Sequence, residues 1–221
     1  MIANILNRIA ELLYPPKCLF CQKTLTRGQI DLCPNCRAAA PEFTKSKIKY
    51  SFIARWTSLW YYKDMARRSI LRYKFYNRRS YAKSFGRLLA MKLQKEGMDD
   101  FDLLTWVPVS PLRRFRRGYD QVELLARAVA RELNIKPKRL LQKIRHTPPQ
   151  SGIREYAQRK ANILGAYRTV HQELVRGKRI LLLDDVLTSG ATASECAKTL
   201  SISGAQQIYF AAIAASEHTK N

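Results

Sequence analysis

Two adjacent carboxylates, Asp184 and Asp185, follow an apolar run at residues 180–183. A short apolar run bounded by charge is typical of a parallel strand that is buried on both faces. Open α/β sheets bind ligands at the carboxyl ends of such strands, which is where we expect the two aspartates to lie. Because carboxylates accept hydrogen bonds and coordinate hard cations, the pair suits sugar hydroxyls and a hydrated magnesium ion.

The turn after the acid pair is rich in hydroxyl groups and leads into a helix that we expect at residues 193–202. Gly190 allows the backbone to turn tightly and to approach a ligand closely. The first amides of a helix have no partner within it, so here they would form a phosphate cradle. A simple helix cap needs only one hydroxyl and leaves the others unexplained. The predicted cradle comprises Thr188, Ser189, Gly190, Ala191 and Thr192.

These residues resemble the motif for phosphoribosyl pyrophosphate (PRPP) in the type I phosphoribosyltransferases, in which two acidic residues precede Thr-Ser/Thr-Gly-x-Thr. The resemblance implies that Asp184 and Asp185 hold the ribose hydroxyls, with Mg²⁺ nearby, and that residues 188–192 hold the 5′-phosphate. No Gly-Lys-Ser/Thr follows, so the pattern is unlike a P-loop.

An arginine cluster follows the strand expected at residues 103–109. Guanidinium groups beyond a parallel strand are well placed to bind phosphate bidentately, and in phosphoribosyltransferases the corresponding loop holds pyrophosphate. The alternative is a solvated basic turn. The predicted pyrophosphate ligands are Arg113, Arg114, Arg116 and Arg117.

Four of the five cysteines form two C-x2-C pairs, separated by eleven residues. Four thiolates leave no open position on a tetrahedral ion, which predicts a structural zinc site. A rubredoxin-type iron centre and free thiols are the alternatives. The ribbon is too short to fold on its own core, so metal binding would supply its folding free energy. The predicted ligands are Cys18, Cys21, Cys33 and Cys36.

Forty Lys and Arg against seventeen Asp and Glu give a formal charge of +23, which favours a polyanionic partner. Between Lys63 and Lys95 there are eleven basic residues and one acid, interleaved with aromatic residues, a composition suited to single-stranded nucleic acid. The alternative is that most of these aromatic residues form core and that the charges are merely solvated. The predicted contacts are Arg67, Arg68, Arg72 and Lys74, with Trp56, Trp60, Tyr61, Tyr62, Tyr73, Phe75 and Tyr76 as stacking candidates.

The chain has no run of eighteen apolar residues, so we expect no transmembrane segment. Residues 1–14 lack the basic region and cleavage site of a secretory signal, and we expect them to form an amphipathic helix docked on the domain. Attachment of this helix to a membrane surface is the alternative. This predicts a cytoplasmic protein in a reducing compartment, which argues against disulfides.

The remaining pattern alternates strands with helices, which predicts an α/β fold with one doubly wound parallel sheet of the type I phosphoribosyltransferase kind. A small zinc ribbon with the N-terminal helix would occupy residues 1–45 and the PRPP-binding domain residues 46–221. We expect a hairpin at 50–62, helices at 63–75, 79–94, 121–133 and 153–161, and strands at 103–109, 140–144, 166–170 and 207–214.

At a narrower level the chain resembles the ComF family. The resemblance lies in the ribbon after Pro15 and Pro16, in VPVSPLRRFRRGYDQVELLA, in RHTPPQSGIREYAQRKANILGAY and in the PRPP motif. ComF proteins are implicated in natural competence. Members more often carry Phe-Asn at Tyr119 and Asp120, so this chain adds a negative charge beside the arginines. The family's two signatures include Arg117, Gly118 and Gln121, and then Gln150, Arg159 and Asn162.

The resemblance implies a protein of DNA uptake that binds PRPP and handles single-stranded DNA, with other uptake proteins as candidate partners. The alternative is an active phosphoribosyltransferase that acts on an unknown acceptor without DNA, with Asp184 and Asp185 as catalytic residues. In that case residues 145–162 would close over the site. The enzyme would also need an acceptor pocket, which the ribbon or the expected hairpin would have to supply.

Overall fold

The computed structural model describes residues 15–44, 46–145 and 162–217 of the 221-residue chain. Its centre is a four-stranded sheet with the strand order β1-β6-β5-β2, in which all neighbours are parallel. The two central strands are almost entirely buried, as their apolar sequences predict. The parallel α/β sheet expected from the sequence is therefore confirmed. The strands are β1 (Arg55–Tyr61), β2 (Leu103–Trp106), β5 (Arg179–Leu187) and β6 (Gln207–Ala215).

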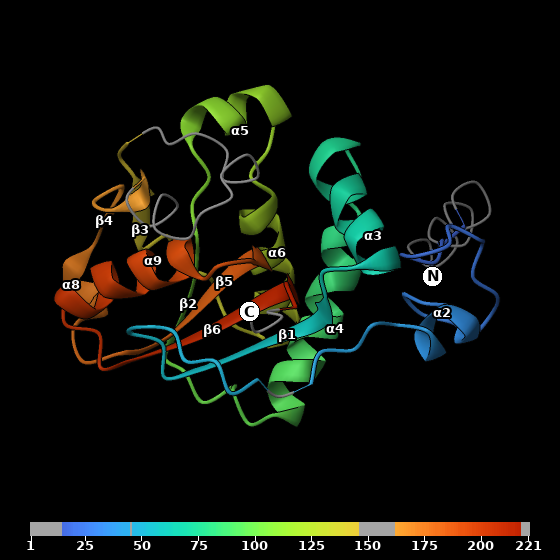
Figure 1. The fold of residues 1–221 in the computed structure, drawn as a ribbon, viewed down its shortest axis with the longest axis horizontal. Coiled ribbons are helices and arrows are strands. Elements are labelled where there is room, and N and C mark those ends of the chain that lie inside the picture. Colours follow the sequence, from blue (N-terminus) through green and yellow to red (C-terminus); the bar gives the residue numbers. More distant parts are fainter. Residues whose placement is uncertain (1–14, 45, 146–161, 218–221) are drawn as a thin grey trace, which may run out of the picture.

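Helices cover both faces of the sheet, so the domain has three layers (Figure 1). Alternate residues of β5 enter different cores, because successive side chains of a strand point to opposite faces. Leu181 and Leu183 pack with the helices α3 (Asp64–Phe75), α4 (Tyr81–Lys95) and α6 (Gln121–Glu132). Ile180 and Leu182 pack on the other face with α9 (Ala191–Ile202) and α8 (Gln172–Val175).

A small antiparallel sheet pairs β3 (Leu141–Lys143) with β4 (Tyr167–Thr169). It is tied to α9, because the Thr169 hydroxyl donates to the Thr199 carbonyl oxygen at 3.2 Å. The segment that joins the two strands was predicted to contain a helix at 153–161 and a closing loop. Residues 146–161, with Gln150 and Arg159, lie outside the described residues, as does the helix expected at 1–14.

The hairpin predicted at residues 50–62 is wrong. Only one strand forms there, β1, and it joins the parallel sheet beside β6. Residues 57–60 are all buried, so both faces of this strand pack against protein and none of the run is available for a solvated hairpin. Residues 41–43 cover its free edge, where Phe43 N donates to Leu59 O and Tyr61 N donates to Pro41 O.

The arginine cluster expected in a loop lies instead on a short helix, α5 (Pro111–Arg117). Its start follows from local chemistry, because Ser110 caps the helix by accepting from Arg113 N and a proline stands in the first turn. Gly118, with φ of 73°, ends it in the left-handed conformation. The preceding strand is shorter than predicted and stops at Trp106, before Pro108, which has no amide to donate.

The cysteine ribbon carries one short helix, α2 (Pro34–Ala38), and packs against α3 and α4. Phe20 meets Trp60 of β1 edge to face, with 4.9 Å between the ring centroids. One guanidinium nitrogen of Arg72 donates to the carbonyl oxygens of Leu19 and Phe20, each at 2.8 Å. The ribbon therefore shares its core with the α/β domain, and the predicted division at residue 45 stays a prediction.

Within the described ranges, none of the helices has the length and apolar character needed to cross a membrane.

Candidate functional site

Asp185 is a buried carboxylate with two side-chain partners from different helices. Lys74, in the last turn of α3, places its ammonium 2.7 Å from one carboxylate oxygen. Gln121, the first residue of α6, donates its amide to the other oxygen at 2.9 Å. Both oxygens of Asp185 are thus held on the face of the sheet that α3 and α6 cover.

Asp184 projects toward the opposite face, because the strand β5 continues through both aspartates to Leu187 rather than ending before them. Burial raises the pKa of Asp184 well above its ordinary value, and the neighbouring Asp185 raises it further. Burial raises the pKa of the Cys196 thiol on α9, and the charge of Asp184 raises it further. The acid pair therefore presents one paired carboxylate and one that is costly to ionise without a cation.

Two tyrosines lock the end of α3 onto the start of α6. The hydroxyl of Tyr73 donates to the backbone oxygen of Gln121, and that of Tyr119 donates to the backbone oxygen of Tyr73, each at 2.5 Å. Burial raises the pKa of both phenols, so they remain donors throughout the physiological range. This network fixes Lys74 and Gln121, the two partners of Asp185, relative to one another.

The hydroxyl turn meets the first turn of α9 beyond the acid pair. Gly190 stands at the helix N-cap with φ of 75°, and as a glycine it has no side chain with which to cap the helix. The hydroxyl of Ser189 is buried and has no hydrogen-bond partner among the described residues. A buried hydroxyl without a partner costs free energy, so this turn is suited to a ligand that accepts hydrogen bonds.

Tyr50 packs directly on this turn. A Cβ added to Gly190 would lie 2.0 Å from a ring carbon of Tyr50, so only glycine fits against the ring. The ring is itself held edge to face by Trp56, with centroids 5.3 Å apart. Glycine is thus required twice at position 190, by its backbone angle and by the approach of the ring.

The predicted pyrophosphate arginines face different neighbours on α5. Arg113 is half-buried, and burial together with Arg117 lowers the pKa of its guanidinium. Arg114 lies 3.9 Å from a carboxylate oxygen of Glu123 and is largely exposed. The guanidinium of Arg117 lies over the ring of Phe75, 4.9 Å from its centroid. The side chain of Arg116 lies outside the described part of the structure.

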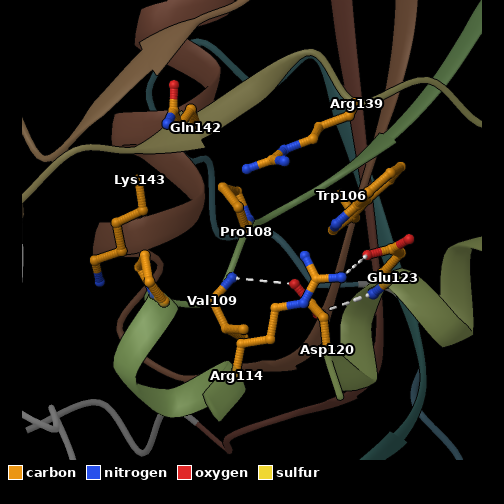
Figure 2. Close-up of a pocket in the computed structure, with 10 residues that line it drawn as sticks. Trp106, Pro108, Val109, Arg114, Asp120, Glu123, Arg139, Gln142 and Lys143 are labelled. Atoms are coloured by element: carbon orange, nitrogen blue, oxygen red, sulfur yellow. Dashed lines mark hydrogen bonds and ion pairs between the residues drawn. The ribbon is translucent and has the colours of Figure 1, made fainter. Parts of the chain in front are cut away.

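A small cleft of about 110 Å³ opens where β2, α5, α6 and β3 meet. Figure 2 shows Arg114 turned toward Glu123 on one side and Arg139 reaching across beside Trp106 on another. Lys143 lies at the far wall, and burial together with Arg113 lowers the pKa of its ammonium to about 8. The cleft combines cations with carboxylates beside the arginine helix, which suits a polar ligand.

Asp120, where the resemblance led us to expect a charge beside the arginines, instead caps α6. One of its oxygens accepts from Val122 N at 2.9 Å and Glu123 N at 3.0 Å, and the other accepts from Val109 N at 3.4 Å. Burial raises the pKa of this carboxyl, although the three amides oppose that shift. The negative charge thus joins the end of β2 to the start of α6 through backbone amides.

The sulfur atoms of Cys18, Cys21, Cys33 and Cys36 all lie within 4.8 Å of one another. Around a tetrahedral zinc ion, with Zn–S distances of about 2.3 Å, neighbouring sulfurs lie about 3.8 Å apart. The sulfurs of Cys21 and Cys33 are 3.8 Å apart. The four thiols therefore fit a structural zinc ion.

Two of these thiols carry opposite pKa shifts without metal. Burial alone would raise the pKa of Cys18, but backbone N–H groups, led by that of Cys33, lower it to about 7. Burial and the adjacent thiols raise the pKa of Cys36 to about 12. Four thiols packed this closely cannot all ionise together unless a cation is bound.

The predicted nucleic-acid contacts fall into two groups. Arg67 and Arg68 are exposed on α3, whereas Arg72 is engaged with the ribbon and Lys74 with Asp185. The stacking candidates divide in the same way. Trp60 and Tyr73 are core residues, Trp56, Tyr61 and Tyr62 are half-buried, and Phe75 and Tyr76 are exposed.

Sequence reasoning missed the part that Lys74 and Tyr50 play at the site. Nothing in the local sequence marks Tyr50, because it reaches the site from a segment that is distant in the chain. Lys74 did carry one usable signal, since it occupies the last turn of a helix whose apolar residues would face the sheet. A cation at that position lies beside the carboxyl-terminal part of β5, the central strand that carries the two aspartates.

Comparison with known proteins identifies two domain families in this chain. The double zinc ribbon domain matches residues 9–47, and the phosphoribosyl transferase domain matches residues 123–221. Solved structures add a weaker likeness. The allosteric regulatory enzyme of purine biosynthesis matches 64% of this chain and 29% of its own, with 22% identity and a TM-score of 0.43. The fold assignment therefore rests on the sheet topology and on the domain families.

Curated relatives extend over more of the chain. Competence protein F of Haemophilus influenzae is 28% identical over 182 residues, which cover 80% of this chain and 75% of that protein. DNA utilization protein YhgH of Escherichia coli K12 is 30% identical over 141 residues, 61% of this chain and 60% of that protein. Competence protein ComFC of Streptococcus pneumoniae is 27% identical over 201 residues, covering 86% and 84%.

Proposed function

We propose, because this chain belongs to the family of competence protein F and YhgH, that it binds PRPP and handles single-stranded DNA in the cytoplasm during natural competence. The observation that carries the PRPP part is the buried hydroxyl of Ser189, which lacks a partner in a turn that opens a helix. A phosphate oxygen would accept from this hydroxyl and from the first backbone amides of α9 together.

In the proposed site, the acid pair binds the ribose of PRPP. Asp184 would accept from the ribose hydroxyls on the α9 side of β5, while Asp185 stays fixed by Lys74 and Gln121. The raised pKa of Asp184 supports a cationic ligand there, because a divalent ion would make its ionisation favourable. Mg²⁺ would enter with PRPP and neutralise its pyrophosphate. Arg113, which is half-buried and interacts electrostatically with Asp185, would contribute to binding that charge.

The DNA part of the proposal rests on the charge of +23 and on the relatives named for competence and DNA utilization. Exposed basic side chains attract the phosphate backbone irrespective of sequence. The predicted contacts Arg67 and Arg68 remain available on the outer face of α3.

Calorimetric titration with Mg²⁺ and PRPP tests this function. We expect saturable binding of PRPP. Ribose 5-phosphate should compete with PRPP for the hydroxyl turn, and pyrophosphate should compete with it for the arginines. Ser189→Ala should weaken the binding of PRPP and of ribose 5-phosphate but leave the binding of pyrophosphate unchanged. Ser201→Ala, in the last turn of the same helix, is the matched control. Absence of PRPP binding by the folded, zinc-loaded protein would refute the proposal.

A second candidate function is phosphoribosyl transfer, which the cleft beside α5 favours. An acceptor nitrogen held there would form a bond to the anomeric carbon while the bond from that carbon to pyrophosphate breaks. The acceptor proton would pass to a base, and the arginines would stabilise the leaving group. Pyrophosphate release from PRPP in the presence of candidate acceptors, with and without DNA, separates an enzyme from a binding protein.

A further inference from the structure

Three strongly exposed aromatic side chains lie at the ends of two helices. Phe75 and Tyr76, at the end of α3, are 60% and 70% exposed, and Phe115 on α5 is 86% exposed. Aromatic rings of this size are normally buried, since burial stabilises them. Grouped exposed rings therefore indicate a surface that receives a partner.

Two cation–π contacts join the ends of α3 and α5 into one surface. The guanidinium of Arg117 lies over the ring of Phe75, 4.9 Å from its centroid, and that of Arg79 lies over the ring of Tyr119, 4.7 Å from its centroid. Both helix ends lie on the same side of the molecule in Figure 1. We call this the α3–α5 surface, formed by Phe75, Tyr76, Arg78, Arg114, Phe115 and Arg117.

The charge of the α3–α5 surface is mainly positive, although Arg114 pairs with Glu123 of α6 at 3.9 Å. No Asp or Glu occurs at residues 65–95 or 110–119, the two segments that form it. Arg78 and Arg114 are exposed. Cations interleaved with exposed rings complement a flexible polyanion whose units carry both a negative charge and a flat apolar face.

We infer that the α3–α5 surface binds single-stranded DNA by stacking bases on Phe75, Tyr76 and Phe115 while the arginines contact phosphates. The inference rests on the proposed function for the identity of the polyanion. It places the strand across the end of α3, where Phe75 and Tyr76 are exposed. Arg72 and Lys74 in the last turn are engaged elsewhere and are not part of this surface. A duplex is disfavoured since its bases are not free to stack, and a membrane is disfavoured since aliphatic anchors are few here.

The position of this surface brings the strand close to the acid pair. Phe75 follows Lys74 directly, and Lys74 contacts Asp185 at 2.7 Å. The hydroxyl of Tyr119, whose ring lies beneath Arg79, donates to the backbone oxygen of Tyr73 on α3. A nucleotide stacked on Phe75 would therefore lie at the rim of the site proposed for PRPP.

Fluorescence anisotropy with a labelled 20-nucleotide oligothymidine tests the inference on the full-length, zinc-loaded protein. Phe115→Ala and Phe75→Ala should each weaken binding about tenfold, since one stacked base contributes on that order. Phe115→Tyr should keep the affinity, whereas Phe115→Leu should lose it, which separates stacking from a general apolar contact. Ile202→Ala is the matched control, because Ile202 is 75% exposed at the far end of α9.

The arginine contribution needs its own pair of variants. Arg78→Gln should weaken binding and lower the slope of log affinity against log salt by about 0.7, the value for one phosphate contact on a single strand. Arg131→Gln, near the far end of α6 from the site, should change neither. Crosslinking with 5-iodouracil-substituted oligonucleotide should label peptides that contain Phe75, Tyr76 or Phe115.

The outcomes distinguish the two proposals. Binding by the wild type that is unchanged in Phe115→Ala and Phe75→Ala would overturn the α3–α5 surface and leave DNA binding intact. Absence of any single-strand binding would overturn the DNA part of the proposed function. Equal affinity for duplex and single-stranded DNA would contradict stacking. So would wild-type affinity in Phe115→Leu when Phe115→Ala has lost it. Either result would favour another polyanion or a protein partner.

Discussion

Lys74 of α3 and Asp185 of β5 form an ion pair of 2.7 Å in which both side chains are largely buried. The pair connects a basic helix to the acidic end of a central strand. Gln121 completes it by donating to the second oxygen of Asp185. A charged pair removed from water is tolerated only when its hydrogen bonds are satisfied, so each partner depends on the other.

Lys74→Met should destabilise the fold by about 3 kcal/mol, because it leaves the Asp185 carboxylate buried without its cation. Asp185→Asn in the same background should recover much of this loss, since an amide needs no counter-charge. Urea unfolding of the two single variants and the double variant forms the cycle that measures the coupling. Additive effects in the cycle would show that the ion pair contributes nothing to stability.

Arg72→Ala should loosen the ribbon without releasing its metal. The variant loses two hydrogen bonds from a charged donor to Leu19 and Phe20, for which we expect a loss of about 2 kcal/mol. Cys36→Ser should instead lower the zinc content below one per chain. Metal analysis with unfolding curves separates these cases, and exposed Arg68→Ala is the control. Loss of zinc from Arg72→Ala would contradict the assigned role.

Gly190→Ala should cost more than a left-handed backbone alone. The φ of 75° accounts for about 1 kcal/mol, and the clash with the Tyr50 ring adds to it. Gly177→Ala is the matched control, because Gly177 has a φ of 71° but open space around its Cβ. Adding Tyr50→Ala to Gly190→Ala should make the double variant more stable than the sum of the single effects predicts. Equal costs at positions 190 and 177 would remove the ring contact from the explanation.

The raised pKa of Asp184 gives stability a definite pH dependence. The folded protein holds this proton more tightly than the unfolded chain, so the contribution of Asp184 to stability falls as pH rises above about 4. Asp184→Asn removes the ionisation and should gain stability relative to wild type as pH increases through that window. Unfolding both proteins in parallel at each pH cancels other titrations. A constant difference between them would show that Asp184 is not perturbed.

The elements that were predicted best from the sequence are those whose signals are local. Short stretches of sequence were enough to predict the apolar strands β5 and β6, the periodic helices and the cluster of four cysteines. The same holds for the hydroxyl turn, where Gly190 adopts the conformation that favours glycine. Local pattern was sufficient wherever one segment carried the whole feature.

The errors arose where distant segments decide the outcome. The run at 50–62 was predicted as a hairpin because its alternation is compatible with either one strand or two, and only pairing with β6 resolves this. The arginine segment is a different case, because Ser110 and Gly118 mark the two ends of its helix locally and the prediction overlooked both signals. Lys74 and Tyr50 meet the site only through tertiary packing, which no local pattern encodes.

The most direct test of the central claim is PRPP affinity in the acid-pair double variant Asp184→Asn/Asp185→Asn, measured by calorimetry with and without Mg²⁺. The substitutions are nearly isosteric, and circular dichroism with a zinc count establishes that the fold persists. We expect wild type to bind in a Mg²⁺-dependent manner and the double variant to lose at least a hundredfold in affinity, about 2.7 kcal/mol. Unchanged affinity in the folded double variant would contradict the assignment of this site to PRPP.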